Sequence, residues 1–301
     1  MDSERLRIWV AFFIVCTVWG STWLAIKIGL ETVPPFLAAG IRFVIASSVL
    51  GVIVKARGIP LPRDADAVKV YLTLGILSFS LPFGLVYWGQ QYIPSGLSSI
   101  LFAAYPGWVA LFSHVALPAE RMDAFKVSGV VLGALGLVVI FSRDVHWSGT
   151  EGLLGMSAVM ISTVLQAISL VIIKKYGQPV SPFAMNLAGM TLGAGMLLIG
   201  SVLFEDPASA IFTPPAVASI LYLALVGSIL TFGSYFWLLK RVEAVYLSLT
   251  SFVNPIIAVL LGAVVLGESL APTVFMGALL VLLGILTANG RFFYKKARHA
   301  P

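Results

Sequence analysis

Charged side chains are scarce in this sequence of 301 residues. Asp, Glu, Lys and Arg together make up 11% of the chain, whereas 59% of the residues are hydrophobic and the mean hydropathy is +1.00. Soluble domains carry about 25% charged residues. A water-soluble globular fold is therefore excluded, and the composition predicts an all-α integral membrane protein in contact with the lipid bilayer.

The residue clusters that enzymes use are also missing. The single cysteine, Cys16, cannot form an intramolecular disulfide. The sequence has no H-E-x-x-H motif, and its apolar stretches hold no pair of carboxylates, so we predict no metal site, no cofactor and no enzymatic activity. The formal net charge of +6 comes from short basic clusters between apolar stretches, so we expect no binding of nucleic acid.

Long apolar stretches are what the sequence does contain. A membrane span needs about 20 mainly apolar residues. Ten stretches qualify, namely residues 8–29, 35–54, 69–90, 95–116, 124–142, 152–173, 181–204, 216–239, 244–266 and 272–291. The sequence therefore predicts ten transmembrane helices.

Basic residues are distributed unevenly around these ten spans. All but three of the 19, the exceptions being Lys27, Arg42 and Arg143, fall in or next to segments on the same side of the membrane as the N-terminus. Short cytoplasmic loops carry an excess of Lys and Arg. We therefore predict that both termini are cytoplasmic.

The sequence also repeats itself weakly. Three landmarks recur at a separation of 149 residues, as the pairs Gly84 and Gly233, Trp88 and Trp237, and Pro106 and Pro255. The separation is 147 residues upstream, where Lys27 pairs with Lys174. Because each half holds five spans, an odd number, the second half must enter the membrane from the opposite side. We predict two inverted five-helix repeats, residues 1–147 and 148–301, with the substrate between them.

Polar and aromatic side chains recur at helical spacing within several spans, which suggests a shared cavity. We predict that the substrate contacts Trp19, Trp23, Tyr87, Tyr105, Trp108, Gln166, Ser169, Tyr235, Tyr246 and Asn254, on the first, third, fourth, sixth, eighth and ninth spans. A primary amide near the bilayer centre needs a partner, which favours Gln166 and Asn254. The alternatives are that hydroxyls satisfy their own helix backbone and that tryptophans anchor the span ends.

Two prolines and one arginine lie inside predicted spans. A proline removes a backbone hydrogen bond and bends the helix, so Pro106 and Pro255 are either hinges or static kinks. We expect both spans to bend at corresponding depths. Arg42 is a functional candidate because it is an ion within a span. We favour a structural role, because its long side chain can reach the outer interface and its repeat counterpart is Gly189.

The N-terminal segment WGSTWLAIKIGLETVPPFLAAGIRF, and the two proline-containing spans followed by Glu120 or Glu268, resemble the EamA family of the drug/metabolite transporter superfamily. This resemblance implies a ten-helix exporter of amino acids or related metabolites in a bacterial inner (plasma) membrane. Within the family, the aromatic richness and length most resemble those of aromatic amino acid exporters.

We therefore expect facilitated export of aromatic and other neutral amino acids by alternating access, through a monomer or a homodimer. The alternative is a multidrug or purine-like metabolite exporter of the same superfamily, and proton coupling stays open. A channel is disfavoured because the sequence shows no ring of charge or carbonyl filter.

Overall fold

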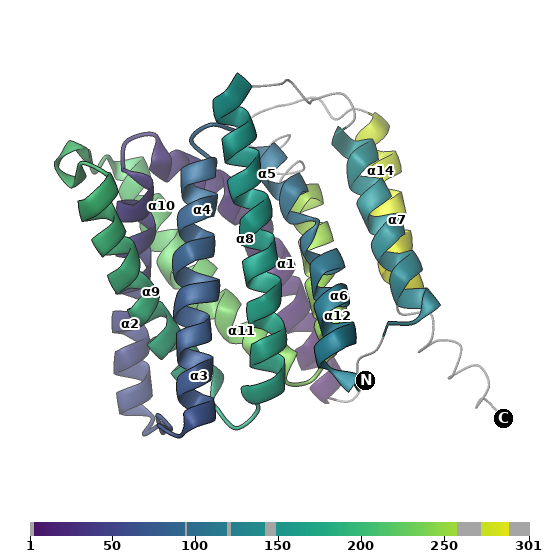
Figure 1. The fold of residues 1–301 in the computed structure, drawn as a ribbon, viewed down its shortest axis with the longest axis horizontal. Coiled ribbons are helices and arrows are strands. Elements are labelled where there is room, and N and C mark those ends of the chain that lie inside the picture. Colours follow the sequence, from purple (N-terminus) through teal and green to yellow (C-terminus); the bar gives the residue numbers. More distant parts are fainter. Residues whose placement is uncertain (1–2, 94, 119–121, 142–148, 258–271, 289–301) are drawn as a thin grey trace.

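The structure is a computed structural model that describes residues 3–93, 95–118, 122–141, 149–257 and 272–288. The described residues form a bundle of helices joined by short loops, with no strand among them (Figure 1). The first half contains α1 (Ser3–Leu30), α2 (Pro35–Ala56), α3 (Ala65–Leu74), η1 (Gly75–Ser80), α4 (Leu81–Gly89), α5 (Ser95–Phe102), α6 (Tyr105–Ala116) and α7 (Ala124–Phe141).

The second half begins with α8 (Gly149–Tyr176) and α9 (Pro182–Phe204) and continues with the short η3 (Pro207–Ser209). It then contains α10 (Pro214–Ala224), η4 (Leu225–Leu230), α11 (Thr231–Leu239), α12 (Ala244–Ser248) and α14 (Pro272–Ala288), and residues 250–257 are also helical. Every predicted span is helical over most of its described residues. Residues 258–266 of the ninth predicted span lie outside the described residues, as do Glu120 and Glu268.

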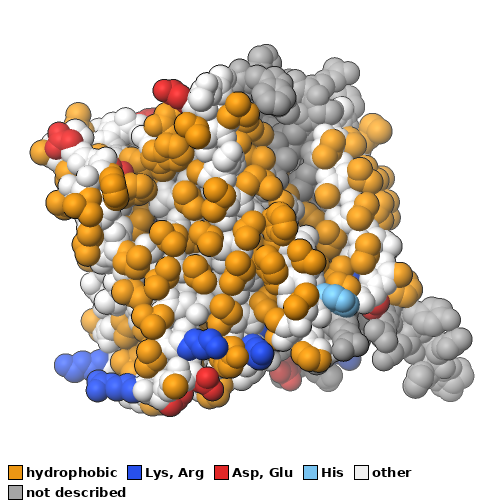
Figure 2. All heavy atoms as spheres, viewed as in Figure 1, with side chains coloured by type: hydrophobic (Ala, Val, Ile, Leu, Met, Phe, Trp, Pro, Cys, Tyr) orange, Lys and Arg blue, Asp and Glu red, His pale blue; other side chains and the backbone are white. Residues whose placement is uncertain are grey.

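Among the described residues, six helices are long and apolar enough to cross a membrane. They run over Glu4–Leu30, Pro35–Ala56, Ala65–Gly89, Gly149–Tyr176, Pro182–Phe204 and Pro214–Leu239, and shorter apolar helices span Ala124–Gly136 and Ala244–Ile257. Large apolar side chains cover the sides of the bundle (Figure 2). Val115 and Phe204, for example, are each 78% exposed. A lateral surface of this kind is stable in lipid and would aggregate in water.

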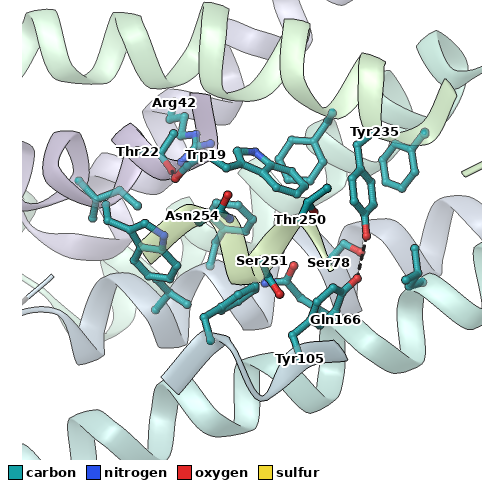
Figure 3. Close-up of a pocket in the computed structure, with 18 of the residues that line it drawn as sticks. Trp19, Thr22, Arg42, Ser78, Tyr105, Gln166, Tyr235, Thr250, Ser251 and Asn254 are labelled. Carbon is teal, nitrogen blue, oxygen red and sulfur yellow. Dashed lines mark hydrogen bonds between the residues drawn. The ribbon is translucent and has the colours of Figure 1, made fainter. Parts of the chain in front are cut away.

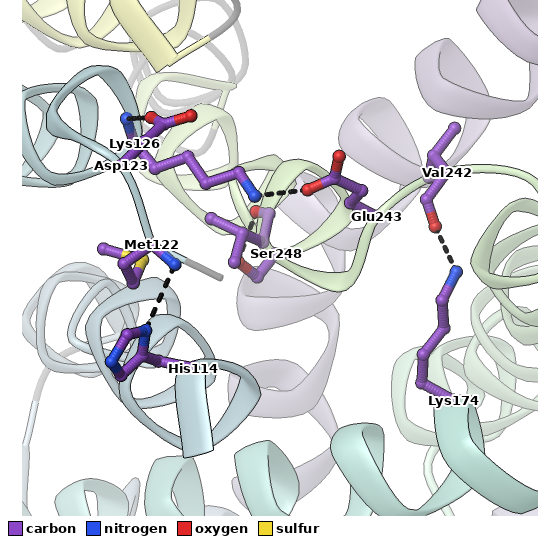
Figure 4. Close-up of polar contacts among 9 residues, drawn as sticks. His114, Met122, Asp123, Lys126, Lys174, Val242, Glu243 and Ser248 are labelled. Carbon is purple, nitrogen blue, oxygen red and sulfur yellow. Dashed lines mark hydrogen bonds and ion pairs between the residues drawn. The ribbon is translucent and has the colours of Figure 1, made fainter. Parts of the chain in front are cut away.

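Lys and Arg gather at one end of the bundle, at the bottom of Figure 2. We call this the N-terminal end because α1 begins there, and we call the opposite end the distal end (Figure 1). At the N-terminal end, Lys126 forms an ion pair with Glu243 (Figure 4). His114 lies nearby, and its Nδ1 accepts a hydrogen bond from the Met122 N–H at 3.3 Å. This contact ties the end of α6 to the segment that leads into α7.

The third and eighth predicted spans each contain a π-helical segment in their middle. These segments are η1 and η4, and both continue directly into an α-helix. In and after η4, hydroxyl groups satisfy carbonyls five residues earlier. Ser228 Oγ donates to Leu223 O at 2.9 Å, and Thr231 Oγ1 donates to Val226 O at 2.7 Å. Segments of π-helix are frequent at functional sites, and both of these flank the cavity described below.

The fourth predicted span is broken near its proline, as expected. α5 ends at Phe102, a turn follows at residues 103–104, and α6 begins at Tyr105 with Pro106 next. The helix interruptions in the two proline-containing spans do not fall at repeat-equivalent residues. In the ninth span the helix is interrupted at Leu249, and Pro255 lies inside the helical residues 250–257. A proline removes only its own N–H donor, so it permits a break without fixing where the turn forms.

Two lysines cap carbonyls at opposite ends of the bundle. Lys27 Nζ donates to Gln90 O at 2.9 Å, just beyond the end of α4. Lys174 Nζ donates to Leu239 O at 2.6 Å and to Val242 O at 2.5 Å, at the end of α11 (Figure 4). Unpaired carbonyls at a helix C-terminus attract cations. Each lysine therefore ties the first long helix of its half to the helix that carries the π-helical segment.

α7 and α14 pack mainly against each other at one side of the bundle (Figure 1). Glycines allow the close approach. A Cβ on Gly284 would lie 2.7 Å from Gly129 O, and one on Gly133 would lie 2.3 Å from the ring of Phe252. Small residues at such crossings let helix backbones pack tightly in lipid.

Candidate functional site

A cavity of about 80 Å³ lies inside the bundle between helices of both halves (Figure 3). Its described walls come from α1 (Trp19, Thr22, Trp23, Ile26), α2 (Arg42), η1 and α4 (Ser78, Phe83, Val86), α5 and α6 (Phe102, Tyr105), α8 (Gln166, Leu170, Ile173), α11 (Phe232, Tyr235, Phe236) and the helical residues 250–257 (Thr250, Ser251, Asn254). These are the six spans expected from the sequence, with the second span added.

The structure brings most of the predicted contact residues to this cavity. Trp19, Trp23, Tyr105, Gln166, Tyr235 and Asn254 all line it. The helices that carry them are far apart in the sequence. Their polar and aromatic residues recur every 3 to 4 positions, and this spacing is the sequence pattern that predicted a shared cavity.

Tyr87 and Ser169 lie one layer behind the wall, where they support residues that line it. Tyr87 Oη accepts from Arg42 Nη1 at 3.2 Å, and Ser169 Oγ lies 2.6 Å from Ser78 Oγ. Both side chains are fully buried, because helix–helix contacts cover the sides of α4 and α8 on which they lie.

Trp108 and Tyr246 are not in the cavity wall. Trp108 stacks on Phe112 within α6 with ring centroids 6.3 Å apart. Lys126 Nζ lies 5.5 Å from the centre of the Tyr246 ring at the N-terminal end. Trp108 is one turn further along α6 than Tyr105, which does line the cavity, and Tyr246 is separated from Thr250 and Asn254 by the interruption at Leu249.

Aromatic rings form most of the apolar wall. The Trp19 ring lies 5.1 Å from that of Phe232 and 4.9 Å from that of Tyr235, in edge-on and tilted arrangements. The Tyr105 and Tyr235 hydroxyl oxygens are 2.8 Å apart, and this hydrogen bond joins α6 of the first half to α11 of the second (Figure 3). Edge-to-face aromatic contacts add about 0.5–1.5 kcal/mol each beyond burial, so the wall is firmly ordered.

The two amides in the wall differ in how their polar atoms are satisfied. The Asn254 side-chain nitrogen donates to Thr250 O at 3.1 Å and to Cys16 O at 3.2 Å. No described group hydrogen-bonds to the Gln166 amide, which faces the cavity. Gln166 can therefore offer both donors and an acceptor to a solute, whereas Asn254 is partly occupied by its own helix and α1.

Arg42 lies at the cavity wall, whereas the sequence favoured a structural role for it. Its side chain does not reach the interface but lies at the cavity wall, and the residue is 1% exposed. Nε donates to Ser228 Oγ at 2.9 Å, and Nη2 donates to Gly227 O at 3.4 Å. The only sequence signal was an ion inside a span, and the glycine at the repeat-equivalent position led us to discount it. No Asp, Glu or His occurs among the described wall residues, so Arg42 supplies the formal charge.

The sequence profile of the EamA-like transporter family matches the chain twice, over residues 7–142 and 153–290. The chain is 30% identical to the uncharacterized transporter YoaV of Bacillus subtilis over 97% of its own length and 99% of YoaV. It is 27% identical to the uncharacterized inner membrane transporter YedA of Escherichia coli over 97% of its own length and 94% of YedA.

The fold is shared with a crystal structure of a protein that is 20% identical in sequence. The two chains align with a TM-score of 0.80 over 97% of this chain and 98% of the other. Apolar helices, a lipid-compatible surface and a central cavity agree with the family match. The chain therefore belongs to the EamA-like transporter family and is an integral membrane transporter.

Proposed function

We propose that this transporter exports aromatic and other neutral amino acids, or closely related small metabolites, by alternating access. The observation that carries this proposal is the aromatic-walled cavity between the two halves. Carriers bind their substrate near the bilayer midplane between structural repeats, and rock one repeat against the other. The aromatic richness and length that resemble the aromatic amino acid exporter YddG support the same substrate class.

The proposed architecture is ten membrane-spanning helices in two inverted five-helix repeats, residues 1–147 and 148–301. Wall residues at repeat-equivalent positions support it. At a separation of 147 residues the pairs are Trp19 and Gln166, Trp23 and Leu170, and Ile26 and Ile173; at 149 they are Phe83 and Phe232, Val86 and Tyr235, Phe102 and Ser251, and Tyr105 and Asn254. Both halves thus contribute equivalent positions to one cavity.

The lysine caps support the opposite orientation of the two halves. Lys27 and Lys174 are repeat-equivalent at 147 residues, and their acceptors Gln90 and Leu239 are equivalent at 149. Lys27 is in the last turn of α1, which ends at the distal end, and Lys174 is in the last turn of α8, which ends at the N-terminal end (Figure 1). The basic residues at the N-terminal end support cytoplasmic termini, by the positive-inside rule.

The proposed transport is facilitated and broad in specificity. The described wall holds no carboxylate or histidine that could carry a coupled proton. Apolar pockets discriminate by only about 1–3 kcal/mol per methylene, so neutral amino acids of different size should compete with one another.

The test is a competition panel with the purified protein in liposomes. Labelled phenylalanine should exchange with saturable kinetics, and unlabelled tryptophan and methionine should compete. Trp19→Ala should weaken phenylalanine binding by about tenfold, because a buried aromatic contact is lost. Trp9→Ala is the matched control, since Trp9 lies on the same helix but faces outward. Transport of amphipathic drugs or purine-like metabolites in place of all three amino acids would contradict the proposal, and flux that does not saturate would indicate a channel.

A further inference from the structure

We infer that Arg42 binds a carboxylate group of the substrate, which makes the transported solutes carboxylates with an apolar or aromatic body. This inference rests on the proposed function, because it concerns the same cavity.

Arg42 is a buried cation that no described carboxylate neutralises. All of its described hydrogen-bond partners are neutral: the hydroxyls of Ser228 and Tyr87 and the carbonyl of Gly227. A charge inside a membrane protein is costly, and such residues pair with an opposite charge or serve a transported solute. The cavity beside this guanidinium therefore has a positive potential that an anionic group would complete.

The guanidinium also has hydrogen-bond donors to spare. It carries five N–H groups, and three of them meet described acceptors, one from each nitrogen. One N–H therefore remains on each terminal nitrogen. Two N–H donors on the same guanidinium match the two oxygens of a carboxylate, which Arg binds in a bidentate manner.

The surroundings hold Arg42 in a fixed position. The guanidinium carbon lies 4.9 Å from the Phe83 ring centre and 5.3 Å from that of Phe43. Gly227 in η4 lies directly against it, since a Cβ there would lie 3.4 Å from Nη2. Ser228 Oγ donates to its own helix, which directs a lone pair at Arg42 Nε. A guanidinium ordered in this way loses little entropy on binding a carboxylate.

The rest of the cavity suits the body of such a solute. Arg42 lies beside Thr22 and Trp19 at one side of the cavity, with Gln166, Tyr105 and Tyr235 across it (Figure 3). A carboxylate at Arg42 would place an attached aromatic or aliphatic group against the ring wall. The substrate is thereby oriented, with its anionic end toward α2 and η4.

The experiment compares four probes with purified protein in detergent and in liposomes. L-phenylalanine and 3-phenylpropanoate carry a carboxylate, whereas L-phenylalaninamide and phenethylamine do not. The wild type should bind the two carboxylates at least tenfold more tightly than the other two probes. Arg42→Gln should weaken the binding of phenylalanine and phenylpropanoate on the order of 100-fold, with little change for phenylalaninamide. Arg42→Lys should be intermediate, because it keeps the charge and loses the bidentate geometry.

Arg57→Gln is the matched control, since Arg57 caps the other end of α2 and is exposed. Equal losses for all four probes in Arg42→Gln would mean a structural role only and would overturn the inference. If that variant does not give a monodisperse protein, the wild-type ranking decides: amide and amine probes that bind as well as phenylalanine also overturn it. Binding of phenylpropanoate without any amino acid would support Arg42 as the anchor and refute amino acid export.

Discussion

The hydrogen bond between Tyr105 and Tyr235 allows a quantitative test of how the two halves meet at the cavity. The two hydroxyl oxygens lie 2.8 Å apart, and the residues are 6% and 4% exposed. Removing one hydroxyl leaves the other buried without its partner, which costs about 1–3 kcal/mol. Removing both leaves no unpaired group, so the double variant should cost no more than either single one.

Thermal unfolding in detergent measures this coupling. Tyr105→Phe and Tyr235→Phe should each lower the melting temperature by a few degrees, at about 2 °C per kcal/mol for a chain of this size. The double variant should match a single variant, so the coupling energy should be about as large as one single cost. Additive effects in the double variant would refute the reasoning, because they would mean that the two hydroxyls do not depend on each other.

The same pair should also influence transport, because it joins α6 to α11 across the cavity. If the bond stabilises this arrangement by about 1 kcal/mol, its loss shifts the balance between arrangements about fivefold. Exchange of labelled phenylalanine should change accordingly. Tyr222→Phe is the matched control, since the Tyr222 hydroxyl bonds to Ser21 outside the cavity wall; it should lower stability without altering exchange.

Three further outcomes follow from the described contacts. Lys174→Met should lower the melting temperature more than Lys27→Met, because Lys174 donates to two carbonyls and Lys27 to one, each worth about 1.5–3 kcal/mol; equal melting temperatures would contradict this. Gly133→Ala should destabilise by about 1–3 kcal/mol through contact with a neighbouring ring, whereas Gly195→Ala, with open space around it, should be neutral or slightly stabilising. An imposed pH gradient should not accelerate phenylalanine flux in liposomes, and strong acceleration would show proton coupling.

Hydrophobic stretches predicted the helices well, because a bilayer requires every span to satisfy its own backbone. Helix faces were predictable where a helix is regular, as at Trp19 and Trp23 on α1. They were less predictable near an interruption: Tyr246 lies before the one at Leu249 and does not share the cavity face of Thr250 and Asn254. Where a helix breaks depends on packing against neighbours, and no local sequence pattern records that packing.

The π-helical segments and the role of Arg42 could not be predicted for a related reason. No residue type within η1 or η4 demands a π-turn; in η4 the hydroxyl of Ser228 satisfies a carbonyl five residues earlier, a contact that the sequence alone does not reveal. Arg42 is held by Ser228 and Gly227 of η4, which is far away in the sequence. A charge in a span shows that a partner or solute is needed, but only the three-dimensional arrangement shows where the charge points.

The cavity's polar and charged groups lie at positions where the two halves have different residues. A substrate that meets identical groups from both halves would have no preferred direction, yet Arg42 is matched by Gly189, Trp19 by Gln166 and Val86 by Tyr235. Gly189 cannot be replaced by a larger residue without a clash, because a Cβ there would lie 2.6 Å from the Leu74 side chain. The second half therefore has no room for an equivalent cation at this position. In the proposed inverted-repeat architecture, Arg42 is therefore an anchor present in one half only, and it fixes how a solute lies in the cavity.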